Sequence, residues 1–161
     1  AQHLADCLAV IAPLRRELGS VTSPRLLDVG SGGGLPGVVL AIAEPGWDVT
    51  CVDAVGKKAA FIRQVAGELA LPNLHAEHTR VETLDAPSFD AITARAFAPL
   101  ADLARLTRKL LAARGVWMAM KGKRPDEELA ALPANVTAFN VEPLDVPGLV
   151  AQRCLVWMRQ T

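Results

Sequence analysis

A glycine-rich turn behind an apolar segment is the part of this sequence best suited to bind a ligand. Residues 25–29 predict a buried strand, and Gly30, Gly32 and Gly34 follow Asp28 at alternate positions. Glycine accepts a positive φ and has no Cβ, so a ligand can lie directly against backbone at the start of the next helix. The turn therefore predicts a pocket for a nucleotide-like cofactor. A glycine-rich loop without a ligand is the simpler alternative.

The spacing of the glycines separates two classes of cofactor. The dinucleotide fingerprint G-x-G-x-x-G needs a small residue at position 35, where this sequence has Leu35. The turn resembles instead the S-adenosyl-L-methionine (SAM) loop of Rossmann-like methyltransferases. That resemblance implies that Asp28 helps to hold the loop and the methionine moiety. SAM is therefore the favoured cofactor, with S-adenosyl-L-homocysteine as its product.

A carboxylate is expected at the end of the next strand. Residues 48–53 predict a strand that ends on Asp53. A carboxylate at this point can accept hydrogen bonds from both hydroxyls of a ribose. An aspartate that caps a helix or faces solvent is the alternative, and the preceding glycine turn favours ribose binding.

The histidines and cysteines do not predict a metal site. His75 and His78 are three residues apart, and in a strand they would point to opposite faces. The three cysteines have apolar surroundings and no C-x-x-C spacing, so they are expected to be reduced thiols of the core. They are Cys7, Cys51 and Cys154.

Composition predicts a single folded domain over residues 1–161, with 51% hydrophobic residues and no long apolar stretch that would indicate a membrane span. There are 17 basic and 17 acidic residues, which give a formal net charge of zero. A neutral chain does not by itself indicate nucleic-acid binding, but a local basic patch is compatible with it.

Strands and helices alternate along the chain. Strands are expected at 25–29, 48–53, 74–77, 89–94, 116–120, 136–144 and 154–158, and helices at 3–18, 35–43, 56–70 and 126–132, with one more ending at Leu111. In the helix over 56–70, the residues expected to face inward are Ala60, Phe61, Val65 and Leu69. The order predicts an α/β, Rossmann-like fold: a seven-stranded, mostly parallel sheet with one antiparallel strand and helices on both faces.

Basic residues follow the expected fourth and fifth strands. Ligands of open α/β sheets bind beyond the carboxyl ends of the strands, so Arg95 should face the pocket. Lys121, Lys123 and Arg124 follow the fifth strand, and Arg153 should lie near the same rim. Attraction of phosphates is the functional interpretation of this cluster, and a solvated charged loop is the alternative.

Several short motifs resemble one bacterial family. They are Asp-Val-Gly-Ser-Gly-Gly-Gly-Leu-Pro-Gly at 28–37, Gly-Lys-Lys at 56–58 with Phe-Ile-Arg-Gln-Val at 61–65, Arg-Val-Glu at 80–82, Arg-Ala-Phe-Ala at 95–98, Lys-Gly at 121–122 and Arg-Cys-Leu-Val at 153–156. The chain resembles, over nearly its whole length, the bacterial small-subunit rRNA guanine-N7 methyltransferases, also called glucose-inhibited division protein B. Members usually carry a further N-terminal helical segment that a sequence starting at Ala1 would lack.

The resemblance implies transfer of a methyl group from SAM to guanine N7 in the 530 loop of 16S rRNA. It places Gly30, Leu35, Val81 and Glu82 in the cofactor pocket, Arg95 at the junction of cofactor and substrate, and His3, Arg80, Lys121 and Arg153 around the active site. We expect a monomeric cytoplasmic enzyme that acts on 16S rRNA or the small ribosomal subunit, without a metal, a membrane or DNA as partner.

This chemistry fits a sequence without an obvious catalytic base. Guanine N7 carries a lone pair and no proton, so the enzyme has only to align it with the methyl group and stabilise a cationic product. Arg95 could donate to guanine O6 or to a phosphate. It could equally form a salt bridge to Asp53 or Glu82 and only shape the pocket. Phe97 could stack on an extruded guanine or belong to the core.

Other function classes remain alternatives at this point. A SAM-dependent methyltransferase for a small molecule or a protein would explain the glycine turn and Asp53, but not the basic rim. A non-catalytic nucleotide-binding module could use the same fold. A dehydrogenase is the weakest alternative, because Leu35 breaks its fingerprint and no acid–base pair is apparent.

Overall fold

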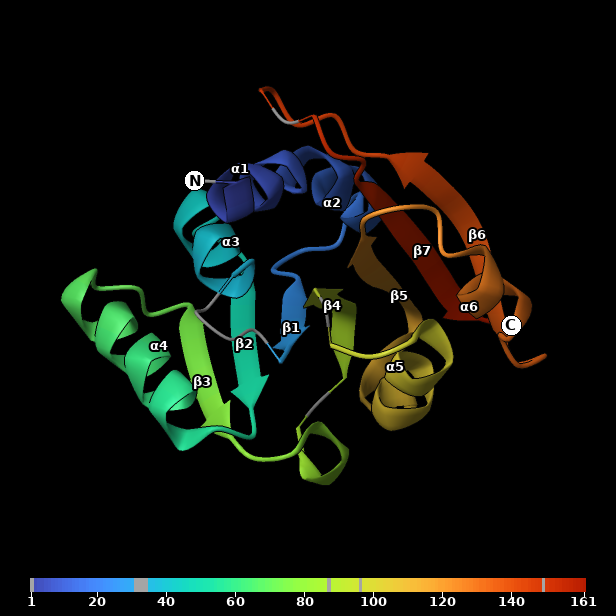
Figure 1. The fold of residues 1–161 in the computed structure, drawn as a ribbon. Helices are drawn as coiled ribbons and strands as arrows, with labels where there is room; N and C mark the ends of the chain where they lie inside the picture. Colours follow the sequence, from blue (N-terminus) through green and yellow to red (C-terminus); the bar gives the residue numbers. More distant parts are fainter. Residues whose placement is uncertain (1, 31–34, 87, 96, 149) are drawn as a thin grey trace.

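One seven-stranded sheet organises the protein. The structure, a computed structural model, describes residues 2–30, 35–86, 88–95, 97–148 and 150–161. The strands stand in the order β3-β2-β1-β4-β5-β7-β6 (Figure 1). Their bounds are β1 Arg25–Val29, β2 Asp48–Asp53, β3 Leu74–His78, β4 Phe89–Arg95, β5 Leu111–Lys121, β6 Val136–Pro143 and β7 Cys154–Gln160. Strands β1 to β5 pair in parallel, and β7 is antiparallel to both of its neighbours. This confirms the predicted α/β fold with one antiparallel strand.

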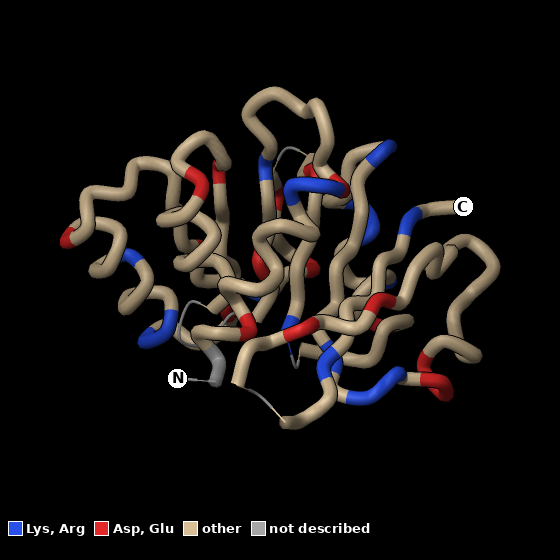
Figure 2. Tube along the Cα trace, turned by 90° about the horizontal axis from the view of Figure 1, so that it is seen from above, with Lys and Arg blue, Asp and Glu red and all other residues tan. Residues whose placement is uncertain are grey.

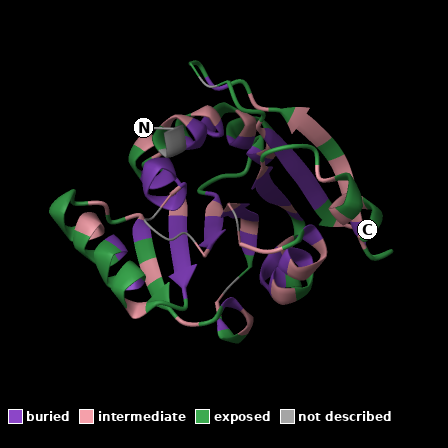
Figure 3. Cartoon of the chain, in the orientation of Figure 1, coloured by how far each residue is buried: buried purple, intermediate pink, exposed green. Residues whose placement is uncertain are grey.

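Helices cover both faces of the sheet, as predicted. They are α1 Gln2–Ala9, α2 Ile11–Leu18, α3 Gly37–Ala43, α4 Gly56–Glu68, α5 Leu100–Thr107 and α6 Asp126–Ala130, with short 3-10 turns η1 Val81–Thr83 and η2 Arg108–Leu110. Helices α1 to α4 share one core with Leu26, Cys51 and Met118, whereas α5 shares the other with Leu27, Val52 and Ile92. Neighbouring residues of a strand point to opposite faces, and most residues of β1, β2 and β4 are buried, so the central strands are covered on both sides (Figure 3). The edge strands β3 and β6 are mostly half-buried or exposed.

The expected helix over 3–18 is two helices. Helix α1 ends at Ala9 and α2 begins at Ile11. Pro13 has no N–H to donate to the carbonyl of Ala9, and its ring crowds that carbonyl, so the first helix cannot continue.

The prediction of the inward face of α4 was wrong. Ala59 and Ile62 are buried, whereas Phe61 and Leu69 are 49% and 53% exposed. Ala60 is exposed as well, and only Val65 is half-buried on the predicted face. Residues 59–62 are all apolar, so their spacing fits two neighbouring faces of a helix and does not select one.

Strand β5 starts earlier than predicted. The preceding helix ends at Thr107, whose hydroxyl accepts a hydrogen bond from Trp117 Nε1 at 2.8 Å. The pairing of β4 with β5 is irregular between Phe89 and Ala91, which oppose Leu111 and Val116. The apolar spacing over 108–111 continues that of α5, so the sequence predicted a longer helix.

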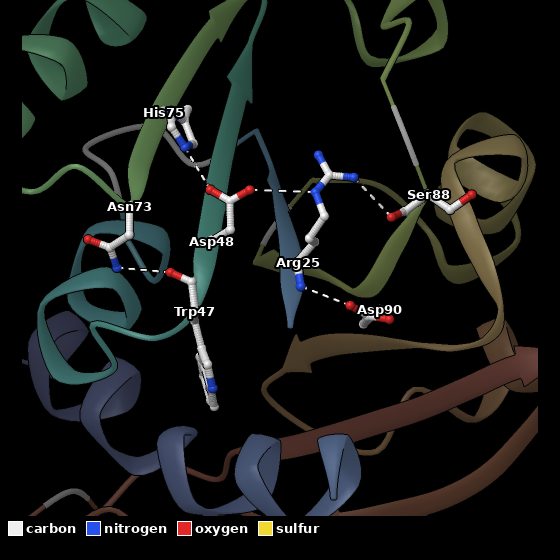
Figure 4. Close-up of polar contacts among 7 residues, drawn as sticks. All are labelled: Arg25, Trp47, Asp48, Asn73, His75, Ser88 and Asp90. Carbon is white, nitrogen blue, oxygen red and sulfur yellow. Dashed lines mark hydrogen bonds and ion pairs between the residues drawn. The ribbon is translucent and has the colours of Figure 1, made fainter. Parts of the chain in front are cut away.

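A polar network holds the amino edge of the sheet (Figure 4). The backbone N–H of Arg25 donates to Asp90 Oδ2 at 2.8 Å, and Arg25 Nη1 donates to the carbonyl of Ser88 at 3.0 Å. His75 Nε2 lies 2.6 Å from Asp48 Oδ1. The Asn73 amide donates to three carbonyls around the end of α3, those of Ala41, Glu44 and Trp47. Within the described ranges, no three His, Cys, Asp or Glu side chains gather as a metal site would require.

The tryptophans lie in the core, and so do the cysteines, as predicted for the cysteines. Trp47, Trp117 and Trp157 are buried. The three cysteines are buried and free. Burial raises the pKa of the Cys7 thiol to about 12, so this thiol stays protonated at neutral pH. No helix in the described part of the chain has both the length and the apolar character to cross a membrane.

Candidate active site

The carboxyl ends of the central strands border an open cavity of about 180 Å³. It is lined by residues that end β1 and β2, by the segment after β3 and by an aromatic residue after β4: Val29, Gly30, Val52, Asp53, Ala54, Thr79, Arg80, Val81, Glu82 and Phe97. The chain winds outward from β1 through β2 to β3 and then returns to β4 on the other side of β1. The cavity therefore lies where ligands of such sheets bind, at the reversal of strand order.

Gly30 forms the floor where the glycine turn leaves β1. Its φ of 62° lies in the left-handed region, and its N–H donates to the Val52 carbonyl at 3.0 Å. A Cβ at this position would lie 2.7 Å from Phe97 Cδ1. Both the backbone conformation and the close ring require glycine. Gly32 and Gly34, also predicted to bind the cofactor, lie outside the described residues.

Asp28 ties the glycine turn to its surroundings. Its side chain is buried; Oδ2 accepts a hydrogen bond from the Gly37 N–H at 2.9 Å, and Oδ1 accepts one from Thr93 Oγ1 at 2.8 Å. The carboxylate thus joins the start of α3 to β4 and fixes both ends of the turn. Leu35 packs against the core on the α1–α4 face, and its contact with a cofactor stays a prediction.

Asp53 ends β2 at the wall of the cavity. The residue is 8% exposed, and its Oδ1 accepts a hydrogen bond from the Val55 N–H at 2.8 Å. Its backbone carbonyl accepts one from the Thr79 N–H at 3.1 Å, which holds the segment after β3 against it. The carboxylate therefore has a fixed position beside Gly30.

The Arg-Val-Glu segment forms the opposite wall. Val81 is buried, and the carbonyl of Glu82 accepts a hydrogen bond from Lys109 Nζ at 2.6 Å. Arg80 Nη1 lies 3.6 Å from Glu82 Oε1, and its side chain is 77% exposed. Val81 can pack against a flat apolar ring, while Arg80 stands at the mouth. The structure thus brings together Gly30, Asp53, Val81 and Glu82, which the sequence predicted as one pocket.

Arg95 lies at the end of β4, half-buried. The residue before it, Ala94, pairs with Val29, so Arg95 stands across from the glycine turn. Its positive charge opposes the rise in the pKa of Cys7 caused mainly by burial, which places it near α1. Asp28 and Asp6 act on the same thiol in the opposite direction. Arg95, Asp28 and Asp6 therefore all lie near the Cys7 thiol of α1.

Three residues of the predicted basic rim form ion pairs, and one of these pairs joins Arg124 Nε to Asp126 Oδ1 at 2.8 Å. Lys121 Nζ lies 2.9 Å from Glu128 Oε1 on α6, and Arg153 Nε donates to Asp6 Oδ2 on α1 at 3.1 Å. Figure 2 shows basic and acidic positions interspersed along the chain. The side chain of His3, a third predicted contact with substrate, lies outside the described part.

Sequence reasoning missed the acidic partners of Lys121 and Arg153. Asp6 is buried, and it precedes the buried Val10 and Leu14 by four and eight positions. An acid that continues the apolar spacing of a helix was the available signal. Glu128 also accepts a hydrogen bond from the Leu100 N–H at 2.9 Å, which only the folded contact between α5 and α6 reveals.

Comparisons with known proteins agree with this architecture. The magnesium protoporphyrin IX methyltransferase of Synechocystis PCC 6803, solved with bound SAM, is 18% identical, with a TM-score of 0.69 over 98% of this chain and 80% of that one. TrmN from Thermus thermophilus is 20% identical, with a TM-score of 0.74 over 94% of this chain and 48% of that one. At these identities the likeness shows the fold, that of SAM-dependent methyltransferases.

Sequence comparison is more specific. The ribosomal RNA small subunit methyltransferase G of Leptothrix cholodnii is 63% identical over 158 residues, which cover 98% of this chain and 72% of that protein. The protein of the same name from Methylibium petroleiphilum is 59% identical, covering 99% of this chain and 72% of that protein. The family described as rRNA small subunit methyltransferase G matches residues 1–156. This chain therefore belongs to the rRNA small subunit methyltransferase G family.

Proposed function

We propose that this protein transfers a methyl group from SAM to N7 of a guanine in the 530 loop of 16S rRNA. The observation that carries the proposal is the cavity in which Gly30, Asp53 and Val81 meet at the carboxyl edge of the sheet, in a chain of this family. The reaction takes place in the cytoplasm, where the small ribosomal subunit is assembled, and we propose that a monomer carries it out.

The lining residues suit the parts of SAM. Asp53 can accept hydrogen bonds from the ribose hydroxyls, because its carboxylate is held at the end of β2 beside the cavity. Val81 and Phe97 offer apolar surface to the adenine ring, and Glu82 offers backbone groups to its edge. The methionine moiety would then lie along the glycine turn, Gly30, Gly32 and Gly34, whose two ends Asp28 fixes.

The transfer requires alignment rather than a base. The N7 lone pair attacks the methyl carbon, the bond from that carbon to sulfur breaks, and its electron pair stays on the sulfur. The products are S-adenosyl-L-homocysteine and a guanine that carries the positive charge. No proton moves, so the protein contributes mainly by holding N7 in line with the breaking bond and by screening the new charge.

Replacement of the attacking atom tests this chemistry directly. A 16S rRNA fragment transcribed with 7-deazaguanosine keeps the Watson–Crick edge of guanine but has carbon in place of N7. We expect normal binding and no methyl transfer, with full transfer to the unmodified fragment. Transfer to the deaza fragment would place the methyl group elsewhere. Transfer to protein or to a small molecule, with none to either RNA, would indicate a different substrate class.

Arg95 is the residue that we propose to contact the target guanine. A guanidinium at the end of β4 can donate to guanine O6 or a neighbouring phosphate while N7 stays free. Arg95→Ala should lower kcat/KM for RNA about 10- to 100-fold with little change in the Kd for SAM. The matched control is Arg105→Ala on the exposed side of α5, where the arginine pairs with Asp102 at 3.3 Å. Full activity of Arg95→Ala would remove Arg95 from this role.

A further inference from the structure

A second cavity of about 380 Å³ opens at the same edge of the sheet, beyond the end of β5. It is lined by apolar residues of β6 and the segment after it, two arginines, and residues near the starts of β7 and of the loop after β5: Val141, Pro143, Leu144, Arg124, Arg153, Gly122, Ala151, Gln152 and Cys154. None of these residues borders the cofactor cavity. The second cavity is large enough for one small ligand.

The strand register fixes where this cavity lies relative to the active site. Lys121 at the end of β5 pairs with Cys154, which also pairs with Pro143 at the end of β6. On the other side of β5, Met120 pairs with Arg95. Strand β7 is therefore two strands from β4, or roughly 10 Å at ordinary strand spacing. An RNA chain that places a guanine at Arg95 can reach this cavity with a neighbouring nucleotide.

The arginines of the cavity are held in place. Arg153 Nε donates to Asp6 Oδ2 at 3.1 Å and Nη1 donates to the Gln152 carbonyl at 2.9 Å, yet the side chain stays 25% exposed. The Asp6 side chain is only 3% exposed, and within the described residues its Oδ1 has no hydrogen-bond partner. A buried carboxylate oxygen without a hydrogen-bond partner costs folding stability. In return, the Asp6 carboxylate holds the Arg153 guanidinium in one position at the mouth of the cavity.

The remaining lining suits a nucleobase. Val141, Pro143 and Leu144 offer an apolar wall, and the Leu144 N–H donates to the Arg153 carbonyl at 2.9 Å, which joins the two walls. Arg124 is 61% exposed and paired with Asp126 at 2.8 Å, so it borders the solvent side. Apolar surface for a base with guanidinium groups for its phosphates is how proteins hold an unstacked nucleotide of single-stranded RNA.

We propose that this cavity is a subsite for an rRNA nucleotide that flanks the methylated guanine. Arg153, fixed by Asp6, and Arg124 bind the phosphates, and the apolar wall contacts the base. The inference rests on the proposed function in one respect only: that RNA is the substrate bound along this edge. It does not depend on which atom of the guanine receives the methyl group.

Gly122→Leu tests the subsite by filling it. A Cβ at Gly122 would meet only the Gln152 carbonyl, at 3.9 Å, so the backbone accepts a side chain there. We expect the Kd and KM for a 16S rRNA fragment to rise about tenfold, because one base contact is lost. The Kd for SAM should change less than about twofold. Unchanged SAM binding shows that the variant is folded. Gly122→Ala should leave the Kd for RNA nearly unchanged.

The matched control is Gly67→Leu on α4, where a Cβ would meet nothing within 4 Å. It should leave the affinities for RNA and SAM unchanged.

Arg124→Gln should also lower the salt dependence of RNA binding by the equivalent of about one phosphate contact. An unchanged RNA Kd in Gly122→Leu would overturn the subsite. Because binding is measured separately from transfer, RNA binding without methylation would contradict the proposed function and still allow the subsite to be judged.

Discussion

Gly37→Ala should destabilise the protein by about 3 kcal/mol and abolish SAM binding. The added Cβ would lie 2.3 Å from Cys51 Sγ and 2.9 Å from Asp28 Oδ2. Both neighbours are buried between α3 and the sheet, so neither can move away cheaply. The same displacement would break the hydrogen bond from the Gly37 N–H to Asp28, which fixes the glycine turn.

Equilibrium unfolding in urea measures the first effect, and calorimetric titration with SAM measures the second. Gly46→Ala is the control, because a Cβ at that glycine would meet nothing within 4 Å. Adding Cys51→Ala to Gly37→Ala should recover part of the lost stability, since it removes the closest clashing atom. A Gly37→Ala protein as stable as Gly46→Ala would show that α3 is less tightly packed on β2 than the distances indicate.

Asp53→Asn should raise the Kd for SAM about 10- to 100-fold with little loss of stability. The amide oxygen of asparagine can still accept the hydrogen bond from the Val55 N–H, which keeps the start of α4 in place. The amide nitrogen of asparagine cannot accept a hydrogen bond from a ribose hydroxyl, and the negative charge is lost. The substitution therefore separates the structural contact of this side chain from its proposed contact with the cofactor.

Asp48→Asn provides the matched control at the other end of β2. Asp48 lies 3.5 Å from Arg25 Nε and 2.6 Å from His75 Nε2, at the amino edge of the sheet (Figure 4). Its replacement should leave the affinity for SAM unchanged. If Asp53→Asn and the unaltered protein bind SAM with equal affinity, Asp53 does not bind the ribose. Its side chain would then serve only to accept the hydrogen bond from the Val55 N–H.

The sequence predicted well those strands and helices whose bounds are determined by a single local pattern of residues. The bounds of β1 and β2 agree with the predicted 25–29 and 48–53, because both are buried on two faces and end at a glycine turn or an acid. The face of α4 could not be predicted, because four consecutive apolar residues leave its orientation to tertiary packing. The start of β5 depends on a bulged pairing with Phe89 that no local pattern encodes.

The candidate site divides in a similar way. The placement of Gly30 and Asp53 at the cavity was predictable because Gly30 follows β1 and Asp53 ends β2, and both residue types are typical of these positions. The pairing of Arg153 with Asp6 joins residues 147 positions apart, and that of Lys121 with Glu128 depends on how α6 packs. Sequence therefore predicted basic residues around the site but not that acidic residues fix two of them.

The most direct measurement is the identity of the methylated nucleoside. Small ribosomal subunits from cells that lack this enzyme would be incubated with the protein and isotopically labelled SAM, and the 16S rRNA digested and analysed by mass spectrometry. Labelled 7-methylguanosine, mapped to the 530 loop, is the predicted result. A labelled nucleoside other than 7-methylguanosine, or SAM binding without any transfer to rRNA, would contradict the proposed reaction.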